Sequence, residues 1–415
     1  MRAMTLSSVA IVLAMATGGC GGSASTLSNP PTVGTVALSC QAAMPFAGPS
    51  PRVAVPGNLF PTATGGAATD RPLPESLTAM LNLRVRELLN TSGAPAISAA
   101  ITIPGFGRWS STQGLAQTQP AQTVGDATEF YWGSIAKMLT AVVVLQLVEE
   151  GKLHMDDRLA RWFPQIPKAE LITIAQLLSH TSGLQTNVHG STGLAAETPA
   201  QQVQLLSNQA LLFCPGTDAS YSNAAYLLLA LVVEALEQQP MHQSVQRRIA
   251  APLGLQHLRA LRPGEDAPIA LAMPHAGQTP TADPGAWTRL GAGNVVGRAE
   301  DLVVFWQAVL SGRLLAPTTV QSQWTVLHAL GPQTREAGQG IQWFGRGVML
   351  TEWTDGVGRT RTWLGHFGGI PTANATVLYD HVANAYAAIA VNSDVSTAAV
   401  ANALLNTVLD WRALH

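Results

Sequence analysis

Charged residues are scarce in this chain of 415 residues. Asp, Glu, Lys and Arg make up only 12% of it, and the formal net charge is -2. A nucleic-acid-binding protein needs a basic stripe or patch, so we expect no nucleic-acid partner. Lysine is especially rare, with only Lys137, Lys152 and Lys168, and the other cations are arginines.

Several common site signatures are also missing. The ten histidines form no His-x-x-x-His or His-x-His pair, and no two cysteines have ligand spacing, so we expect no metal site. The segment GAGNVVG at 291–297 has the wrong glycine spacing for a dinucleotide fingerprint and follows no strand. It indicates a turn before a helix that starts at 299. No serine lies in Gly-x-Ser-x-Gly, which argues against an α/β-hydrolase, and we expect no cofactor.

Two apolar runs stand out, at 9–16 and 224–233, and both are too short to span a membrane. Glu234 ends the second run, which predicts a buried helix. The first run follows Arg2 and leads to Thr17-Gly18-Gly19-Cys20.

Residues 1–20 resemble the signal peptide of a bacterial lipoprotein, in which the cysteine is acylated and becomes the new N-terminus. Thr17 departs from the usual pattern, where a leucine is commoner. The alternative is ordinary secretion with cleavage a few residues later. Either way we expect an exported protein of the periplasm or cell envelope, and lipidation of Cys20 would anchor it to the membrane.

Only two cysteines remain after Cys20, namely Cys40 and Cys214. They could pair in an oxidising compartment, but the sequence leaves this pairing open. Residues 21–70 are rich in Gly, Ser, Thr, Ala and Pro and show no sustained periodicity, which predicts a flexible leader. The folded domain is expected over 71–415.

The rest of the chain alternates between helical and strand-like patterns. Apolar residues spaced three and four apart predict a helix over 75–92, and strands follow at 96–103 and 107–116. Helical patterns dominate 152–260, and strand-like segments return after 340. This order predicts a split α/β domain that is interrupted by a helical one. Further helices are predicted at 135–148, 299–312 and 396–412.

The first candidate motif is Ser134-Ile135-Ala136-Lys137. Three lysines would produce one Ser-x-x-Lys by chance in about one chain in five, so the spacing alone is weak evidence. Residues three apart share a helix face, which lets the Lys137 ammonium approach the Ser134 hydroxyl. A partly desolvated lysine can take the serine proton, and backbone N–H groups of the first turn can stabilise an oxyanion. The alternative is a surface lysine on a core helix.

The second motif is Tyr221-Ser222-Asn223, the only Tyr-x-Asn among five tyrosines. A phenol near a lysine ammonium is expected to have a lowered pKa, in a range useful for proton transfer. The asparagine amide can donate to a substrate carbonyl and accept from the lysine. The alternative is a helix-capping loop with a packed tyrosine.

The third motif is His366-Phe367-Gly368-Gly369, at the end of a strand-like run. A small residue there lets the backbone pass close to a ligand. The N–H group of Gly369 would supply a second oxyanion donor beside that of Ser134. The alternative is a strand-end turn that His366 merely caps.

In this order the three motifs resemble the serine β-lactamase and penicillin-binding superfamily. The similar branch contains the class C β-lactamases, the D-alanyl-D-alanine carboxypeptidases and related esterases. The resemblance runs from about residue 75 to the C-terminus and includes the segments LLSHTSGL (177–184), PGTDASYSNAAYLLL (215–229) and GAGNVVGRAEDLVVF (291–305). It implies an α/β (α+β) fold of the β-lactamase/transpeptidase type: an antiparallel β-sheet flanked by helices, with an inserted all-helical domain at about 152–280. The active site would lie between the two.

The resemblance also implies roles for the motif residues. Ser134 would be the acylated nucleophile, Lys137 its base or electrostatic partner, and Tyr221 the acid/base that passes the proton to the leaving group. His180 and Ser182 fall in a stretch that the family treats as structural. The residues implied in substrate binding are Asn223, His366, Gly368 and Gly369, with the Ser134 and Gly369 amides as the oxyanion hole.

His366 is a departure from the lysine of the usual Lys-Thr-Gly. A lysine is a permanent cation that can hold a substrate carboxylate, whereas a histidine is mostly neutral near pH 7. Phe367 in place of threonine removes a hydroxyl that could bind the same carboxylate. Both changes favour a carboxypeptidase or an esterase over a β-lactamase.

The sequence thus predicts an exported serine hydrolase that acts through an acyl-enzyme on small esters or amides, including D-alanyl peptides of peptidoglycan. Two alternatives stay open. One is a class C-type β-lactamase that hydrolyses β-lactam antibiotics, and the other is an inactive protein that binds or senses cell-wall fragments. The sequence does not indicate an oligomeric state.

Overall fold

The computed structural model describes residues 38–48, 52–61, 71–186, 198–262, 271–281, 289–324, 326–329, 340–355 and 358–415. Residues Leu38–His415 form one compact unit. The signal peptide expected over 1–20, with the lipidation site Cys20, lies outside the described residues. Of the helices that are described, none is long and apolar enough to cross a membrane.

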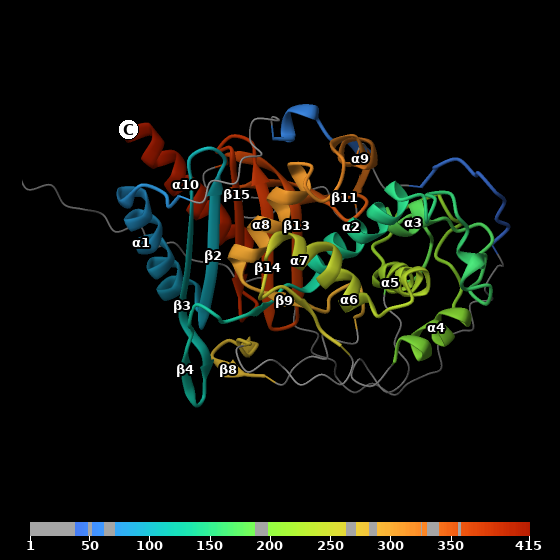
Figure 1. Ribbon diagram of the computed structural model, residues 1–415, viewed down its shortest axis with the longest axis horizontal. Coiled ribbons are helices and arrows are strands. Elements are labelled where there is room, and N and C mark those ends of the chain that lie inside the picture. Colours follow the sequence, from blue (N-terminus) through green and yellow to red (C-terminus); the bar gives the residue numbers. More distant parts are fainter. Residues whose placement is uncertain are drawn as a thin grey trace, which may run out of the picture. The chain divides into compact units, whose positions relative to one another are not determined.

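A ten-stranded sheet runs through the described part of this unit (Figure 1). All neighbouring strands pair antiparallel, as the family resemblance implies. In spatial order the strands are β1 (Arg52–Ala54), β10 (Val326–Ala329), β11 (Gly340–Phe344), β12 (Met349–Thr354), β13 (Thr360–Ile370), β14 (Ala373–Asp380), β15 (Ala385–Val391), β2 (Ala96–Ile103), β3 (Gly107–Thr118) and β4 (Ala121–Thr123).

Strand β13 has neighbours of different length on its two sides. The register with β12 runs from Thr360 to Gly365, whereas the register with β14 continues to Ile370. The backbone edge of β13 that faces β12 therefore extends beyond the β12 ladder over its last five residues. The third sequence motif lies on this stretch, which is a continuing strand and not the strand-end turn of the alternative interpretation.

Helices α1 (Glu75–Ser92) and α10 (Thr397–Leu414) pack against each other and cover one face of the sheet (Figure 1). In α1 the buried residues Leu77, Leu81 and Val85 recur every four positions and form one apolar stripe. The helix ends at Gly93, which has a left-handed φ of 78° that favours glycine. Both predicted boundaries of α1 are confirmed.

The opposite face is covered by α8 (Ala299–Leu310), with α9 (Pro317–Gln323) beside α8, and α2 (Ala136–Glu149) follows the Ser134 turn next to the sheet. Most of α2 is buried on all sides, because the helical part of the unit packs against it as well. That helical part comprises η4 (Leu159–Arg161), α3 (Ile174–Leu178), α4 (Pro199–Ser207), α5 (Asn223–Glu237), α6 (Met241–Val245), the π-helical turn η5 (Gln246–Ala250) and α7 (Ala251–Leu253).

Two small sheets complete the described elements. The first joins β5 (Phe130–Tyr131), β9 (Val295–Gly297) and β6 (Arg259–Ala260), and the second joins β7 (His275–Ala276) and β8 (Thr279–Pro280). Because β5 directly precedes the Ser134 motif and β9 directly follows the 291–294 turn, their pairing brings these two distant segments together.

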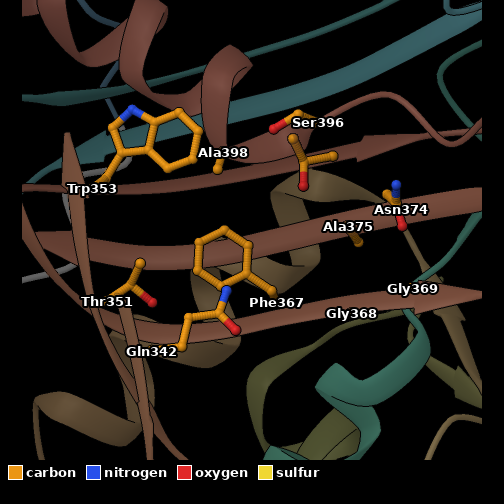
Figure 2. A pocket seen from close by; sticks show the side chains of 11 residues that line it. Gln342, Thr351, Trp353, Phe367, Gly368, Gly369, Asn374, Ala375, Ser396 and Ala398 are labelled. Carbon is orange, nitrogen blue, oxygen red and sulfur yellow. The ribbon is translucent and has the colours of Figure 1, made fainter. Parts of the chain in front are cut away.

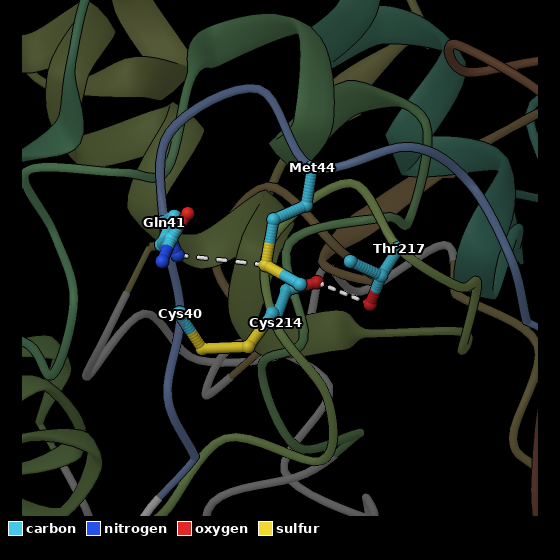
Figure 3. Close-up of a disulfide and its surroundings, with 5 residues drawn as sticks. All are labelled: Cys40, Gln41, Met44, Cys214 and Thr217. Carbon is cyan, nitrogen blue, oxygen red and sulfur yellow. Dashed lines mark hydrogen bonds between the residues drawn. A yellow bond between two sulfur atoms is a disulfide. The ribbon is translucent and has the colours of Figure 1, made fainter.

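The expected flexible leader differs from the structure over 38–48 and 52–61. Cys40 forms a disulfide with Cys214 across a sequence separation of 174 residues (Figure 3). Gly48 donates a backbone hydrogen bond of 2.7 Å to Thr217, and β1 pairs with β10 at the edge of the large sheet. The composition of this segment did not predict its ordered structure, because strand pairing with β10 and the disulfide to Cys214 hold it in place. A 3-10 turn, η1 (Gly57–Leu59), follows β1.

Candidate active site

Ser134 lies in the 3-10 turn η3 (Gly133–Ile135), between β5 and α2. Gly133 has a φ of +51°, and a Cβ there would come within 2.6 Å of the backbone nitrogen of Gly369. Only glycine fits such a close approach in this conformation. The turn therefore holds Ser134 directly against strand β13.

Lys137 lies in the first turn of α2 and is completely buried. Its Nζ lies 3.0 Å from Ser134 Oγ and donates a 2.7 Å hydrogen bond to the main-chain oxygen of Ala292. Burial holds the pKa of Lys137 well below its usual value, and the charge of Arg289 lowers it further. A neutral amine keeps a lone pair, so Lys137 can accept the Ser134 proton.

Tyr221 lies in the loop before α5, with its ring centroid 4.8 Å from Lys137 Nζ. Burial raises the pKa of Tyr221, although a side-chain hydrogen bond with Ser134 and the charge of Arg289 act in the opposite direction. The predicted lowering of this pKa is wrong, because the burial of the phenol outweighs these stabilising interactions. A protonated phenol is a proton donor, so its place beside Ser134 suits protonation of a leaving group.

The loop that carries Tyr221 is fixed by its neighbours. Ser222 donates its backbone N–H to His180 Nδ1 at 3.1 Å, and its hydroxyl caps α5 by accepting from Ala225. The His180 ring lies 4.6 Å from the Tyr221 ring. Asn223 is the first residue of α5, and its N–H donates to Thr186 at 2.8 Å. His180 thus supports Tyr221 from behind.

His366 is buried on β13 and faces the same site. Its Nδ1 lies 2.6 Å from the carbonyl oxygen of Phe367, which can only accept, so Nδ1 carries the ring proton. Burial lowers the pKa of His366 to about 3, with a further contribution from Lys137. The imidazole is therefore neutral at physiological pH and supplies no permanent cation.

Two backbone amides approach the space above Ser134. Phe367 donates its N–H towards Met349 of β12, and N–H directions alternate along a strand, so the N–H of Gly369 points to the same edge. A Cβ on Gly368 would lie 2.9 Å from the Ser134 nitrogen and 1.8 Å from the Trp132 oxygen. The glycines therefore let the Ser134 and Gly369 amides converge, as an oxyanion hole requires.

The site also contains groups that the three motifs did not predict. The Ala292 oxygen holds Lys137, Arg289 acts on both Lys137 and Tyr221, and the Phe344 ring lies 5.0 Å from the Tyr221 ring. Ala292 belongs to the GAGNVVG segment, whose turn was predicted without a role. From the predicted set, the structure brings together Ser134, Lys137, Tyr221, His366, Gly368 and Gly369.

Comparisons with known proteins agree with this architecture. A family model described as Beta-lactamase matches residues 81–409. The putative penicillin-binding protein PbpX of Bacillus subtilis (strain 168) is 29% identical over 48% of this chain and 50% of its own length. Esterase EstB of Burkholderia gladioli is 33% identical over 34% of this chain and 41% of its own length. The chain thus spans about half or less of the length of the curated relatives it matches.

Among solved structures, a D-amino acid amidase from Ochrobactrum anthropi SV3, complexed with L-phenylalanine amide, superposes with a TM-score of 0.67. The superposition covers 81% of this chain and 98% of the amidase, at 21% sequence identity. At this identity the likeness concerns the fold alone. It extends over nearly the whole amidase.

Proposed function

The chain belongs to the beta-lactamase family, and we propose that it is a serine hydrolase that cleaves small esters or amides through an acyl-enzyme on Ser134. The observation that carries this proposal is the 3.0 Å approach of Nζ of the fully buried Lys137 to Ser134 Oγ. Buried ionisable groups with strongly shifted pKa values occur mainly at functional sites, where the shifted protonation state is used. Activation of a serine is such a use.

The proposed proton path follows from these positions. Ser134 Oγ attacks the substrate carbonyl carbon while its proton moves to Lys137, and the Ser134 and Gly369 amides stabilise the oxyanion. When the bond to the leaving group breaks, that group takes the Tyr221 phenolic proton, which Lys137 then replaces. Water attacks the acyl-enzyme by the reverse route, and Ser134 regains its proton.

The neutral state of His366 supports an ester or amide substrate over a β-lactam. A β-lactam antibiotic carries a carboxylate, for which a permanent cation at this place would be the expected partner. Relatives named penicillin-binding protein and esterase share parts of this sequence, which supports the same range of acyl-transfer chemistry.

We also propose that the protein is exported and that its signal peptide is removed directly before Cys20, whose acylation would anchor it to a membrane. The Cys40–Cys214 disulfide supports export, because such bonds persist mainly in oxidising compartments. A lipid-modified Cys20 would add the mass of its acyl groups to the mature chain. Mass spectrometry of protein extracted from membranes would therefore test this part directly.

The enzyme proposal is tested by labelling with a fluorescent fluorophosphonate. Wild type should label in one-to-one stoichiometry, Ser134→Ala should not label, and Ser207→Ala, at the end of α4, should label like wild type. Failure of the wild type to label would instead favour the inactive sensor. Rapid turnover of a chromogenic cephalosporin by unlabelled wild type, lost in Ser134→Ala, would favour the β-lactamase.

A further inference from the structure

A pocket of about 310 Å³ lies against strand β13 on the side of the sheet that α10 covers (Figure 2). Its walls come from β11, β12, β13, β14 and the start of α10. In Figure 2 the Phe367 ring lies over the strand that carries Gly368 and Gly369, with Gln342 and Thr351 beside it and Trp353 farther up the sheet. The lining residues are Gln342, Thr351, Trp353, Phe367, Gly368, Gly369, Asn374, Ala375, Ser396, Thr397 and Ala398.

The pocket shares backbone with the candidate active site. Gly368 and Gly369 line it, and the same two glycines lie against the turn that holds Ser134. Because neither glycine has a side chain, only the thickness of one strand separates the pocket from the Ser134 amide. The β12 ladder ends at Gly365, so a substrate can pass the edge of β13 at this point.

The pocket lies towards the Tyr221 side of the nucleophile. Phe344 packs against Tyr221, with ring centroids 5.0 Å apart. Gln342, two residues earlier on the same face of β11, lines the pocket. Since Tyr221 is the proposed proton donor to the leaving group, a pocket on its side is positioned for that group.

The chemistry of the pocket disfavours a charged occupant. None of its lining residues carries a formal charge, and Trp353 and Phe367 provide two aromatic surfaces. Several of its polar side chains already form hydrogen bonds within the protein. The Thr397 hydroxyl bonds to that of Thr376 at 2.5 Å, and Asn374 donates to the Val395 oxygen.

The start of α10 lines the pocket and attracts an anion through its backbone N–H groups. Ser396 already accepts the N–H of Ala399, which removes one of these donors. A helix end without a charged side chain is a weak anion site compared with a lysine or arginine, so the aromatic surfaces decide the preference.

We propose that this pocket binds the leaving group of the substrate, and that it selects an uncharged alcohol or amine with an aromatic or alkyl group over one that ends in a carboxylate. This inference rests on the proposed function and narrows it. It places neutral esters and amides ahead of D-alanyl-D-alanine peptides, whose leaving group carries a carboxylate.

The test compares two esters of one acyl group, with benzyl alcohol or 4-carboxybenzyl alcohol as the leaving group. Wild type should favour the benzyl ester by at least tenfold in kcat/KM. Phe367→Lys and Gln342→Lys, which place a cation in the pocket, should each reduce that ratio by about tenfold or more. Gln113→Lys, a half-buried glutamine on β3, serves as the matched control and should keep the wild-type ratio.

A wild-type ratio near one, or a preference for the carboxylate ester, would overturn the inference. So would an unchanged ratio in both folded pocket variants. If wild type prefers the carboxylate ester, Arg289 is a cation near the site that could bind it. Loss of that preference in Arg289→Gln would show that Arg289, and not the pocket, selects the leaving group. Failure of wild type to label with the fluorophosphonate, whose leaving group is fluoride, would overturn the proposed function itself.

Discussion

Lys137 donates a 2.7 Å hydrogen bond to the main-chain oxygen of Ala292, which lies 155 residues further along the chain. This bond uses one hydrogen of a neutral amine and directs the rest of the group towards Ser134. It also links the first turn of α2 to the turn before β9. The position of the proposed base thus depends on a backbone atom and not on the chemistry of a side chain.

Replacement of Lys137 by Met should lower kcat/KM for an ester by about 10²–10⁴, because the general base is lost. The wild-type rate should rise as pH passes the lowered pKa of Lys137, and this limb should be absent from the variant. Lys152→Met removes an exposed lysine that pairs with Glu150 and should leave the profile unchanged. Equal rates for Lys137→Met and wild type would contradict the assigned role.

Replacement of Tyr221 by Phe should affect poor leaving groups most, since they need the phenolic proton. We expect a loss of about 10²-fold for alkyl esters and a much smaller loss for 4-nitrophenyl esters. Rates across a series of leaving-group pKa values measure the difference as a steeper slope. Tyr226→Phe removes a buried hydroxyl that bonds to Leu178 and should change stability without changing this slope.

Replacement of His366 by Lys should move the acidic limb of kcat/KM to lower pH, because a second cation lowers the pKa of Lys137 further. It should also raise the relative rate for carboxylate-bearing substrates. Wild-type His366, with a pKa of about 3, should add no limb of its own between pH 5 and pH 9. A wild-type limb in that range that disappears in His366→Gln would show that this imidazole titrates in the working range.

Replacement of Gly368 by Ala should abolish most activity, because its Cβ would overlap the Trp132 oxygen and push β13 away from Ser134. A fall in kcat of about 10²-fold or more is expected, as for a lost oxyanion donor. Gly125→Ala meets nothing within 4 Å and is the matched control. Wild-type kcat in a folded Gly368→Ala variant would mean that β13 can shift without consequence.

Glu237 should contribute stability through its buried bond to Arg248, whose side chain is 8% exposed while that of Glu237 is 3% exposed. Burial raises the pKa of Glu237, but hydrogen bonds from Arg248, Ser244 and Arg247 outweigh it and lower the pKa to about 2. The folded pKa is below the unfolded one, so this stability is present above about pH 4.5 and is lost as pH falls towards 2.

Replacement of Glu237 by Gln should therefore cost about 3 kcal/mol near pH 7 in chemical denaturation, and the difference from wild type should shrink in acid. Glu87→Gln breaks an exposed pair with Arg84 and should cost less than about 0.5 kcal/mol. A constant difference between Glu237→Gln and wild type from pH 7 to pH 3 would refute the linkage.

Local patterns predicted the elements that depend on local spacing. The helix at 75–92 has the predicted bounds because its apolar residues repeat with the helical period. The strand at 96–103 has the predicted bounds because it is a short, nearly continuous apolar run that ends at a Pro-Gly turn signal. Ser134 and Lys137 could be predicted as a pair because residues three apart lie on the same face of a helix.

Features set by distant partners escaped prediction. Ala292 and Phe344 are brought to the site by the pairing of β5 with β9 and of β11 with β12. Neither residue type indicates a catalytic role in the sequence. The pKa of Tyr221 was predicted in the wrong direction because a sequence shows a neighbouring lysine but not the burial of both groups. The order of the segment near Cys40 likewise depends on a partner far along the chain.

The separation of Cys40 from Cys214 has a consequence for how the chain is made. Three cysteines allow three pairings, and only Cys40–Cys214 fixes the loop that leads to Tyr221. If the chain is exported, as proposed, Cys40 leaves the translocation channel well before Cys214, and Cys20 is its nearer competitor. Acylation of Cys20 would remove that competing thiol and leave a single possible partner. In that case, maturation of the N-terminus would also prevent Cys20 from forming a non-native disulfide with Cys40 or Cys214.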